Sequence, residues 1–362
     1  MDQHLEFGID TFGDVTVDGA GRTLSEPEVI RHVVEEAVLA DSVGIDVIGI
    51  GEHHRADFAV SSPEMVLATI AGRTGRIRLA SAVTVLSSDD PVRVFQRFAT
   101  LDALSSGRAE VILGRGSFTE SFPLFGFELD QYQELFEEKV DLFVRLLGEG
   151  PVTWSGRTRS GLADQQVYPR TASGSLPTWI GVGGNPESVV RAAHYGLPLM
   201  LAIIGGESAR FAPLIVLYHR ALDEFERPRL PVGVHSPGFV ADTDDEARTQ
   251  LWPHMKRMRD RIGAERGWGP MGMAEYEQQA GPDGSLYVGS PETVAAKIAA
   301  TVRTLQLTRF TMKYSAGQLP HELLARSIEH YGTEVLPRVR ALLAADADAD
   351  PGPAAAAAAQ RA

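Results

Sequence analysis

The chain has 362 residues, of which 44% are hydrophobic and 23% charged, with a formal net charge of −14 and no cysteine. This is the composition of a folded globular protein; the acidic balance argues against a nucleic acid as partner, and the lack of cysteine excludes disulfides, thiolate nucleophiles and cysteine metal sites. The first residues show no secretion signal and no apolar run approaches the roughly 20 residues that cross a bilayer, so we expect a cytoplasmic protein with no membrane partner.

Strand-like and helix-like segments alternate along the chain. An apolar run at residues 5–9 predicts a first strand, and Ser25 with Glu28 has the capping-box spacing that opens a helix before a second strand at residues 45–50. Further strands are predicted at residues 78–85, 108–113, 178–182, 198–203, 231–240 and 309–313. Further helices, several with a polar cap followed by proline, are predicted at residues 63–74, 91–105, 130–147, 186–195, 208–225, 244–262, 291–305 and 320–340.

Eight strands that alternate with helices predict an α/β protein built as a (β/α)8 TIM barrel, with a doubly wound open sheet as the second choice. We expect one domain over residues 1–343, with irregular insertions at about 148–177 and 263–287. The first insertion is interpreted as a hairpin over the barrel mouth. Substrate specificity is expected in both insertions and in the loops at residues 10–23 and 55–60. Residues 344–362, with Asp-Ala repeats and a polyalanine run, predict a disordered tail.

The segment Gly51-Glu52-His53-His54 directly follows the second predicted strand. Ligand sites in parallel barrels lie at the carboxyl ends of the strands, so this carboxylate and the two imidazoles are candidates for an active site. The alternative is that one histidine merely caps the strand. Adjacent histidines on an extended chain project in different directions, so no metal site is predicted here.

A glycine-rich turn at Gly183-Gly184-Asn185 follows another predicted strand and opens a helix. Glycines allow close approach of a ligand, Asn185 can cap the helix, and free amides in its first turn favour an anion such as phosphate, with the Ser188 hydroxyl close by. Arg115 lies just beyond the neighbouring strand, where its guanidinium can reach the same anion. An ordinary capped turn and a surface arginine are the competing interpretations.

Small and β-branched residues end the third predicted strand at residues 80–85. They suit a flat apolar wall for an aromatic ring, and they equally suit a plain barrel strand. The chain has no phosphate loop ending in Gly-Lys-Ser/Thr, no His-Glu-x-x-His helix and no Gly-x-Ser-x-Gly elbow, which argues against nucleophilic hydrolysis and zinc chemistry.

The ordered set of motifs resembles the bacterial luciferase-like flavin-dependent monooxygenase superfamily across roughly residues 5–340. The similar segments are Gly51-Glu52-His53-His54, Arg78 through Asp90-Pro91-Val92-Arg93, Leu101-Asp102 to Ser106-Gly107-Arg108, Gly114-Arg115-Gly116, Gly183 to Ser188, and Gly317-Gln318-Leu319-Pro320-His321-Glu322.

The resemblance implies a barrel that binds FMN at its carboxyl end and uses reduced FMN and O2 to oxygenate a small organic substrate through a C4a-peroxyflavin. It implies an NAD(P)H-dependent flavin reductase as partner and a homodimer formed through the helices after the second and third strands. By matching position, His53 is the expected catalytic residue, with a role in proton transfer. The residues matched to flavin contacts are Ala82 and Val83, often joined by a cis peptide, and Arg115, Ser117, Gly183, Gly184, Asn185 and Ser188.

Two alternatives remain at this point: an oxidoreductase that moves hydride with deazaflavin F420, and a flavin-binding protein without catalysis. The glycine-rich turn fits either cofactor. The reactive cysteine of bacterial luciferase is replaced by Gly114, so aldehyde chemistry and light emission are not expected. For the dimer, Ala68, Ala71 and Gly72 would allow close approach of two helices, or would pack on the chain's own barrel.

Overall fold

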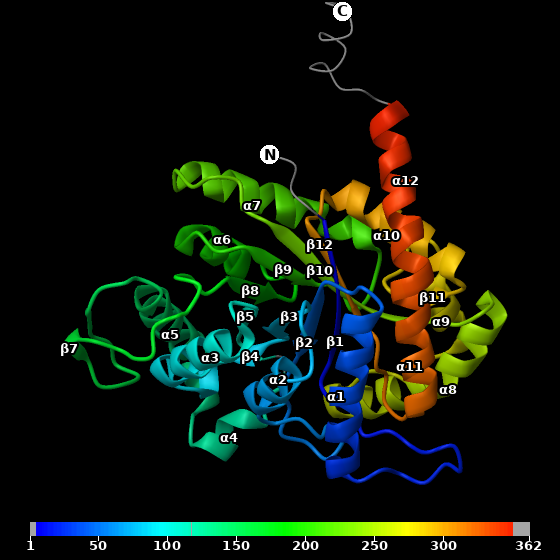
Figure 1. Ribbon diagram of the computed structural model, residues 1–362, viewed down its shortest axis with the longest axis horizontal. Helices are drawn as coiled ribbons and strands as arrows, with labels where there is room; N and C mark the ends of the chain where they lie inside the picture. Colours follow the sequence, from blue (N-terminus) through cyan, green and yellow to red (C-terminus); the bar gives the residue numbers. More distant parts are fainter. Residues whose placement is uncertain (1–4, 117, 350–362) are drawn as a thin grey trace, which may run out of the picture.

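The computed structural model describes residues 5–116 and 118–349, and its core is a closed barrel of eight parallel strands (Figure 1). In chain order these strands are β1 (Glu6–Thr11), β2 (Val47–Ile50), β3 (Arg78–Ser81), β5 (Ala109–Gly114), β8 (Thr178–Val182), β9 (Leu199–Ala202), β10 (Val232–Val240) and β12 (Arg309–Lys313). Pairing of β9 with β10 closes the sheet, so the predicted barrel is confirmed and the open sheet is excluded.

Helices pack around the outside of the strands. They are α1 (Glu26–Ser42), α2 (Pro63–Ala71), α3 (Pro91–Ser105), α5 (Tyr132–Leu146), α6 (Pro186–Tyr195), α7 (Ala212–Glu224), α8 (Asp244–Arg266), α10 (Pro291–Leu305), α11 (His321–His330) and α12 (Leu336–Ala349). The first turns of α1 and α3 carry the predicted capping interactions. Ser25 and Glu28 form a capping box on α1, and the Asp90 carboxylate accepts the first free amides of α3.

Several short elements depart from the prediction. The third strand is broken after Ser81 by a cis peptide between Ala82 and Val83 and resumes as β4 (Thr84–Val85). Elements not expected from the sequence are η1 (Leu86–Ser88), α4 (Ser121–Phe125), η2 (Leu129–Gln131), η3 (Ser208–Phe211), α9 (Met273–Ala280), β11 (Tyr287–Gly289) and the π-helical turn η4 (Tyr331–Val335). Helix α12 extends to Ala349, beyond the expected start of the tail, and the rest of that segment lies outside the described residues.

The first insertion forms the expected hairpin, from β6 (Val152–Trp154) and β7 (Leu162–Gln165), but it does not cover the mouth. It packs on the outer side of the helices: the Trp154 indole donates to Asp141 of α5 at 2.8 Å, and Gln96 of α3 donates to the Tyr168 carbonyl at 2.8 Å. Figure 1 shows β7 far from the strands. The reason is connectivity, because a segment that follows a helix leaves from the amino ends of the strands, opposite the mouth.

Charged side chains close the amino end of the barrel interior. Arg309 is 1% exposed and pairs with Glu6 and Glu110, while Arg78 donates to Glu110 at 2.6 Å. The Arg309 guanidinium also stacks 4.3 Å above the ring of Trp179. This network fills the amino end of the lumen, opposite the carboxyl ends of the strands where barrel enzymes bind ligands.

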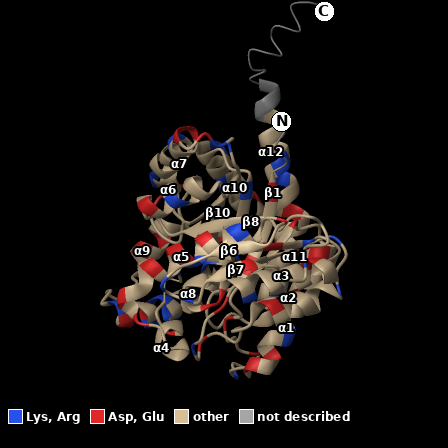
Figure 2. Cartoon of the chain, turned by 90° about the vertical axis from the view of Figure 1, so that its left-hand side faces the viewer, with Lys and Arg blue, Asp and Glu red and all other residues tan. Residues whose placement is uncertain are grey.

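The outer surface carries mixed charge, with acidic and basic residues interspersed along the helices in Figure 2. None of the helices within residues 5–116 and 118–349 is long and apolar enough to cross a bilayer.

Candidate active site

His53 lies just past β2, at the open end of the barrel. Its Nδ1 is 2.9 Å from Oε1 of Glu120, and three rings pack around the imidazole, those of Phe12, Phe58 and Phe118. Although burial opposes it, the hydrogen bond from His53 lowers the pKa of Glu120, so the carboxylate stays ionised and accepts the Nδ1 proton. In neutral His53 this leaves Nε2 as the free proton acceptor.

Glu52 and His54, on either side of His53 in the sequence, contact other parts of the barrel. Glu52 accepts the backbone amide of Val85 at 2.5 Å and so anchors the strand segment that follows the cis peptide. His54 turns toward Glu52, with 3.6 Å between Nε2 and Oε2. His53 thus has a hydrogen-bonded carboxylate partner, whereas Nε2 of His54 makes no hydrogen bond to a residue that the structure describes.

Ala82 and Val83 join β3 to β4 and lie beside glycines of the two neighbouring strands, Gly49 of β2 and Gly114 of β5. A Cβ placed on Gly49 would come within 2.8 Å of the Ala82 Cβ, and one on Gly114 within 2.3 Å of a Val83 methyl group. Only glycine therefore fits beside this peptide. Both residues are half-buried, and Val83 packs against Ile112, Trp179 and Met200. That they form the wall for a ring stays a prediction.

The glycine-rich turn differs from the expectation in one respect. Gly184 has φ +110°, which favours glycine, and Asn185 caps α6 as predicted. However, the Asn185 side chain itself accepts the amides of Glu187 and Ser188, so these first-turn amides are not free for an anion. The Ser188 hydroxyl and neighbouring side chains remain as donors.

Helix α5 joins Arg115 to this turn through a chain of hydrogen bonds. Arg115 donates to Gln133 at 2.9 Å, and Gln133 donates to Glu137 at 2.8 Å. Arg191 donates to the same Glu137 oxygen at 2.7 Å and to the Ser188 hydroxyl at 3.3 Å. Arg191 therefore pairs with Glu137 directly, whereas Arg115 is linked to that carboxylate only through Gln133. Two guanidinium groups near the ends of β5 and β8 are an arrangement suited to a dianionic phosphate. Ser117 lies outside the described residues.

Asp10 and His235 form a second histidine–carboxylate pair inside the barrel, 2.6 Å apart on β1 and β10. Asp10 is 1% exposed, and it faces the lumen because a Cβ on Gly49 would meet its Cβ at 3.0 Å. The sequence analysis missed this pair and also Glu120 and Arg191. Signals existed for two of them: Asp10 ends the first strand, and Arg191 follows Ser188 by three positions on one helical face.

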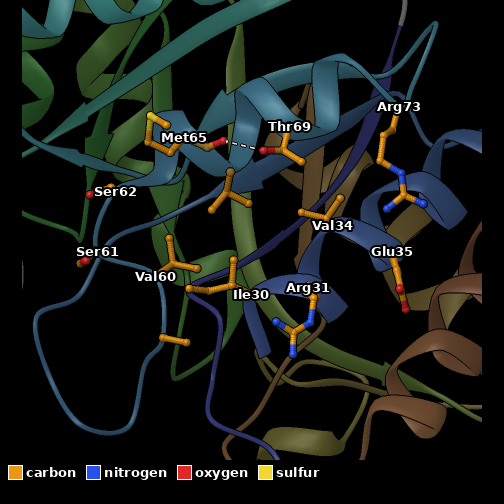
Figure 3. Close-up of a pocket in the computed structure, with 12 residues that line it drawn as sticks. Ile30, Arg31, Val34, Glu35, Val60, Ser61, Ser62, Met65, Thr69 and Arg73 are labelled. Carbon is orange, nitrogen blue, oxygen red and sulfur yellow. Dashed lines mark hydrogen bonds between the residues drawn. The ribbon is translucent and has the colours of Figure 1, made fainter. Parts of the chain in front are cut away.

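A surface groove of about 540 Å³ lies elsewhere, between α1 and α2 (Figure 3). Its lining combines apolar side chains such as Val34 with charged ones such as Arg31, and Met65 of α2 is 71% exposed on its rim. The small residues singled out on α2 pack inward instead: Ala71 is buried in the chain's own core and Ala68 packs against that core. These two alanines thus pack on the chain's own barrel, whereas Gly72 is exposed, and the homodimer stays a prediction.

A profile of the luciferase-like monooxygenase family matches residues 6–308, over eight-tenths of the chain. The chain belongs to the luciferase-like monooxygenase family. Among its relatives, the uncharacterized protein y4vJ of Sinorhizobium fredii is 24% identical, over 88% of this chain and 94% of that protein. The 4-hydroxyprotoasukamycin monooxygenase of Streptomyces nodosus is 31% identical over 66% of each chain.

Solved structures share the fold of this luciferase-like protein. Monooxygenase RslO1 from Streptomyces bottropensis aligns with a TM-score of 0.79 at 23% identity, over 92% of this chain and 99% of its own. The oxygenating component of 3,6-diketocamphane monooxygenase from Pseudomonas putida, in complex with FMN, aligns with a TM-score of 0.74 at 19% identity, over 92% of this chain and 99% of its own. The F420-dependent tetrahydromethanopterin reductase of Methanopyrus kandleri aligns with a TM-score of 0.70 at 17% identity, over 93% of this chain and 99% of its own. Family neighbours thus bind either FMN or F420.

Proposed function

We propose that this protein is a monooxygenase that uses reduced FMN and O2 to oxygenate a small organic substrate. The observation that carries the proposal is the placement of two features at one barrel mouth. His53 with Glu120 follows β2, the Ala82–Val83 peptide follows the adjacent strand β3, and Arg115 with Ser188 and Arg191 stands at the ends of the neighbouring strands β5 and β8. This arrangement fits a ring and a phosphate at opposite ends of one ligand.

Each residue then has a physical role. Arg115 and Ser188 would bind the phosphate, and Gln133 and Glu137 would hold the guanidinium groups in place. Ala82 and Val83 would support the ring, with Gly183 and Gly184 allowing the ribityl chain to approach. Reduced FMN, when bound, supplies the two electrons with which O2 is activated. His53, oriented by Glu120, would accept or donate the accompanying proton at Nε2.

Two observations favour FMN over F420. The clamp holds two guanidinium groups, of which only Arg191 is paired with a carboxylate, and that excess of positive charge suits the dianion of a terminal phosphate monoester better than the single charge of a phosphodiester. The relative with the highest identity given above is also a monooxygenase. As partners we propose a separate flavin reductase that supplies reduced FMN, and a second copy of the chain through α2 and α3, whose Met65 and Leu104 are 71% and 62% exposed.

An anaerobic titration with reduced FMN and with reduced F420 tests the cofactor. We expect tighter binding of FMN, followed by consumption of O2 when air is admitted. A His53→Ala variant should bind FMN normally and change the rate and pH dependence of that reaction, whereas His54→Ala, in which the adjacent imidazole is lost, should not. Tighter binding of F420 without O2 consumption would favour a hydride-transfer enzyme, and unchanged turnover in His53→Ala would favour a flavin-binding protein without catalysis.

A further inference from the structure

Two histidines and a glutamate from opposite ends of the chain meet away from the barrel mouth. His32 and Glu35 lie on successive turns of α1, and His321 is the first residue of α11. One ligand atom from each of the three lies within 4.8 Å of the others. The two imidazole rings are stacked, with centroids 3.9 Å apart and an angle of 18° between the planes.

His321 is held in a fixed orientation by a buried carboxylate. Its Nδ1 is 2.8 Å from Oε1 of Glu36, which is only 3% exposed, and the other Glu36 oxygen accepts the hydroxyl of Tyr314 at 2.6 Å. This leaves Nε2 of His321 directed toward Glu35, 4.0 Å from its carboxylate. A carboxylate behind one ring nitrogen is the arrangement that orients histidine ligands in metal sites, because it fixes the tautomer and strengthens the free nitrogen as a donor.

His32 lacks such a partner. Its Nδ1 is buried and makes no hydrogen bond to any residue that the structure describes. A buried polar atom without a partner is costly, so this nitrogen needs an explanation. Burial, and after it the charge of His321, lower the pKa of His32, and the carboxylates of Glu36, Glu35 and Glu322 oppose this shift only in part.

Glu35 is the member of the cluster that lies closest to arginine side chains, and the Arg73 guanidinium points toward it in Figure 3. Arg31 and Arg73 line the groove between α1 and α2 that Glu35 borders at one side (Figure 3). Glu35 itself is 57% exposed along its side chain, so it can swing toward an ion and leaves one side of the cluster open to water.

We propose that His32, Glu35 and His321 form a divalent transition-metal site, with Zn²⁺ as the best-matched ion and a water as fourth ligand. Two imidazole nitrogens and one carboxylate are a ligand set that zinc uses, with bonds of about 2.0–2.2 Å. Binding requires the stacked rings to separate, because ligands around a tetrahedral ion diverge. His32 is the ring free to move, since Glu36 holds His321. The ion would join the first helix of the barrel to the helices that close it, independently of the flavin chemistry.

Titration of ZnCl2 into the tag-free, EDTA-treated and dialysed chain, followed by calorimetry, tests the proposal. The chain has no cysteine, so thiolates cannot contribute to the signal. We expect one saturable Zn²⁺ per chain and a zinc-dependent rise in Tm, because the ion binds only the folded state. Co²⁺ should give the visible absorption of a low-coordinate site.

Variants assign the site. His32→Asn and His321→Asn should abolish binding, and Glu35→Gln, which changes an exposed side chain and so cannot unfold the protein, should weaken it at least tenfold. Glu36→Gln should weaken it about 10- to 100-fold through the orientation of His321. The matched control is His330→Asn. His330 also lies beside carboxylates, Glu334 at 2.8 Å and Asp242 at 3.0 Å, but it is not part of the group formed by His32, Glu35 and His321. His53→Asn controls for the barrel mouth.

Retained binding in both controls together with loss in His32→Asn supports the site. Absence of saturable binding overturns it, and so does zinc binding that survives in His32→Asn and Glu35→Gln or disappears in His53→Asn. None of these results depends on flavin binding, so failure of the metal site and failure of the proposed monooxygenase function are separate outcomes.

Discussion

Replacing Arg115 with methionine removes one guanidinium from the proposed phosphate clamp and keeps the length of the apolar stem. Arg115 donates to Gln133 in the described structure, and this neutral hydrogen bond would be exchanged for contacts to phosphate oxygens. A charge-assisted hydrogen bond contributes about 1.5–3 kcal/mol. When the lost hydrogen bond to Gln133 is subtracted from a bidentate contact between Arg115 and the phosphate, about 2–3 kcal/mol of binding free energy remains. We therefore expect Arg115→Met to weaken FMN binding by about 30- to 150-fold.

Equilibrium titration by flavin fluorescence measures this loss, and riboflavin, which lacks the phosphate, provides the internal comparison. Riboflavin affinity should change less than about threefold, because the substitution leaves the ring site untouched. Arg93→Met is the matched control, since Arg93 also donates to a single glutamine, Gln96, at 2.7 Å, but on the exposed side of α3. Equal losses for FMN and riboflavin, or an FMN affinity like that of the wild type, would refute the phosphate assignment.

Three further perturbations follow from contacts in the barrel. Gly114→Ala should lower stability by about 1–3 kcal/mol and weaken FMN binding, because the new methyl would meet Val83 at 2.3 Å; an unchanged Tm and Kd would contradict this contact. Arg309→Met should cost about 3–5 kcal/mol in urea unfolding, since it leaves the fully buried Glu110 with only Arg78 as a cation, and a loss below 1 kcal/mol would argue against the network. Because the pKa of Glu120 is lowered in the folded state, the ionised carboxylate stabilises the fold above pH 4.5, and this stabilisation is lost as the pH falls through the pKa of Glu120 in the folded protein. The Tm difference between wild type and Glu120→Gln should therefore hold near neutrality and disappear in acid. A Tm difference that grows in acid would contradict the lowered pKa.

Local chemistry in the sequence accounts for most of the barrel. The capping box at Ser25 and the Asp90-Pro91 start of α3 lie where helices begin, and the apolar runs before them coincide with parallel strands. These signals act within a few residues, so they can be read without knowledge of the fold. The short elements α4, α9 and β11 were missed because packing against a neighbour, rather than periodicity, holds three to eight residues in place.

The candidate site divides along the same physical boundary. His53 and the turn at Asn185 could be selected from the sequence because each follows a strand end, where barrels bind ligands. The partners of these residues could not. Glu120 is 67 positions from His53, and Asp10 is 225 positions from His235. Such pairs depend on which strands become neighbours when the barrel closes.

The sequence by itself therefore determined the order of strands and helices, the family and the turns that bear chemistry, since these depend on short-range patterns of polarity, capping and glycine. The tertiary structure alone decided which carboxylate orients which imidazole, that Asn185 occupies the amides expected to bind an anion, and that His32 meets His321. Hydrogen bonds and charge interactions act over a few ångströms in space, and separation along the chain does not encode that distance.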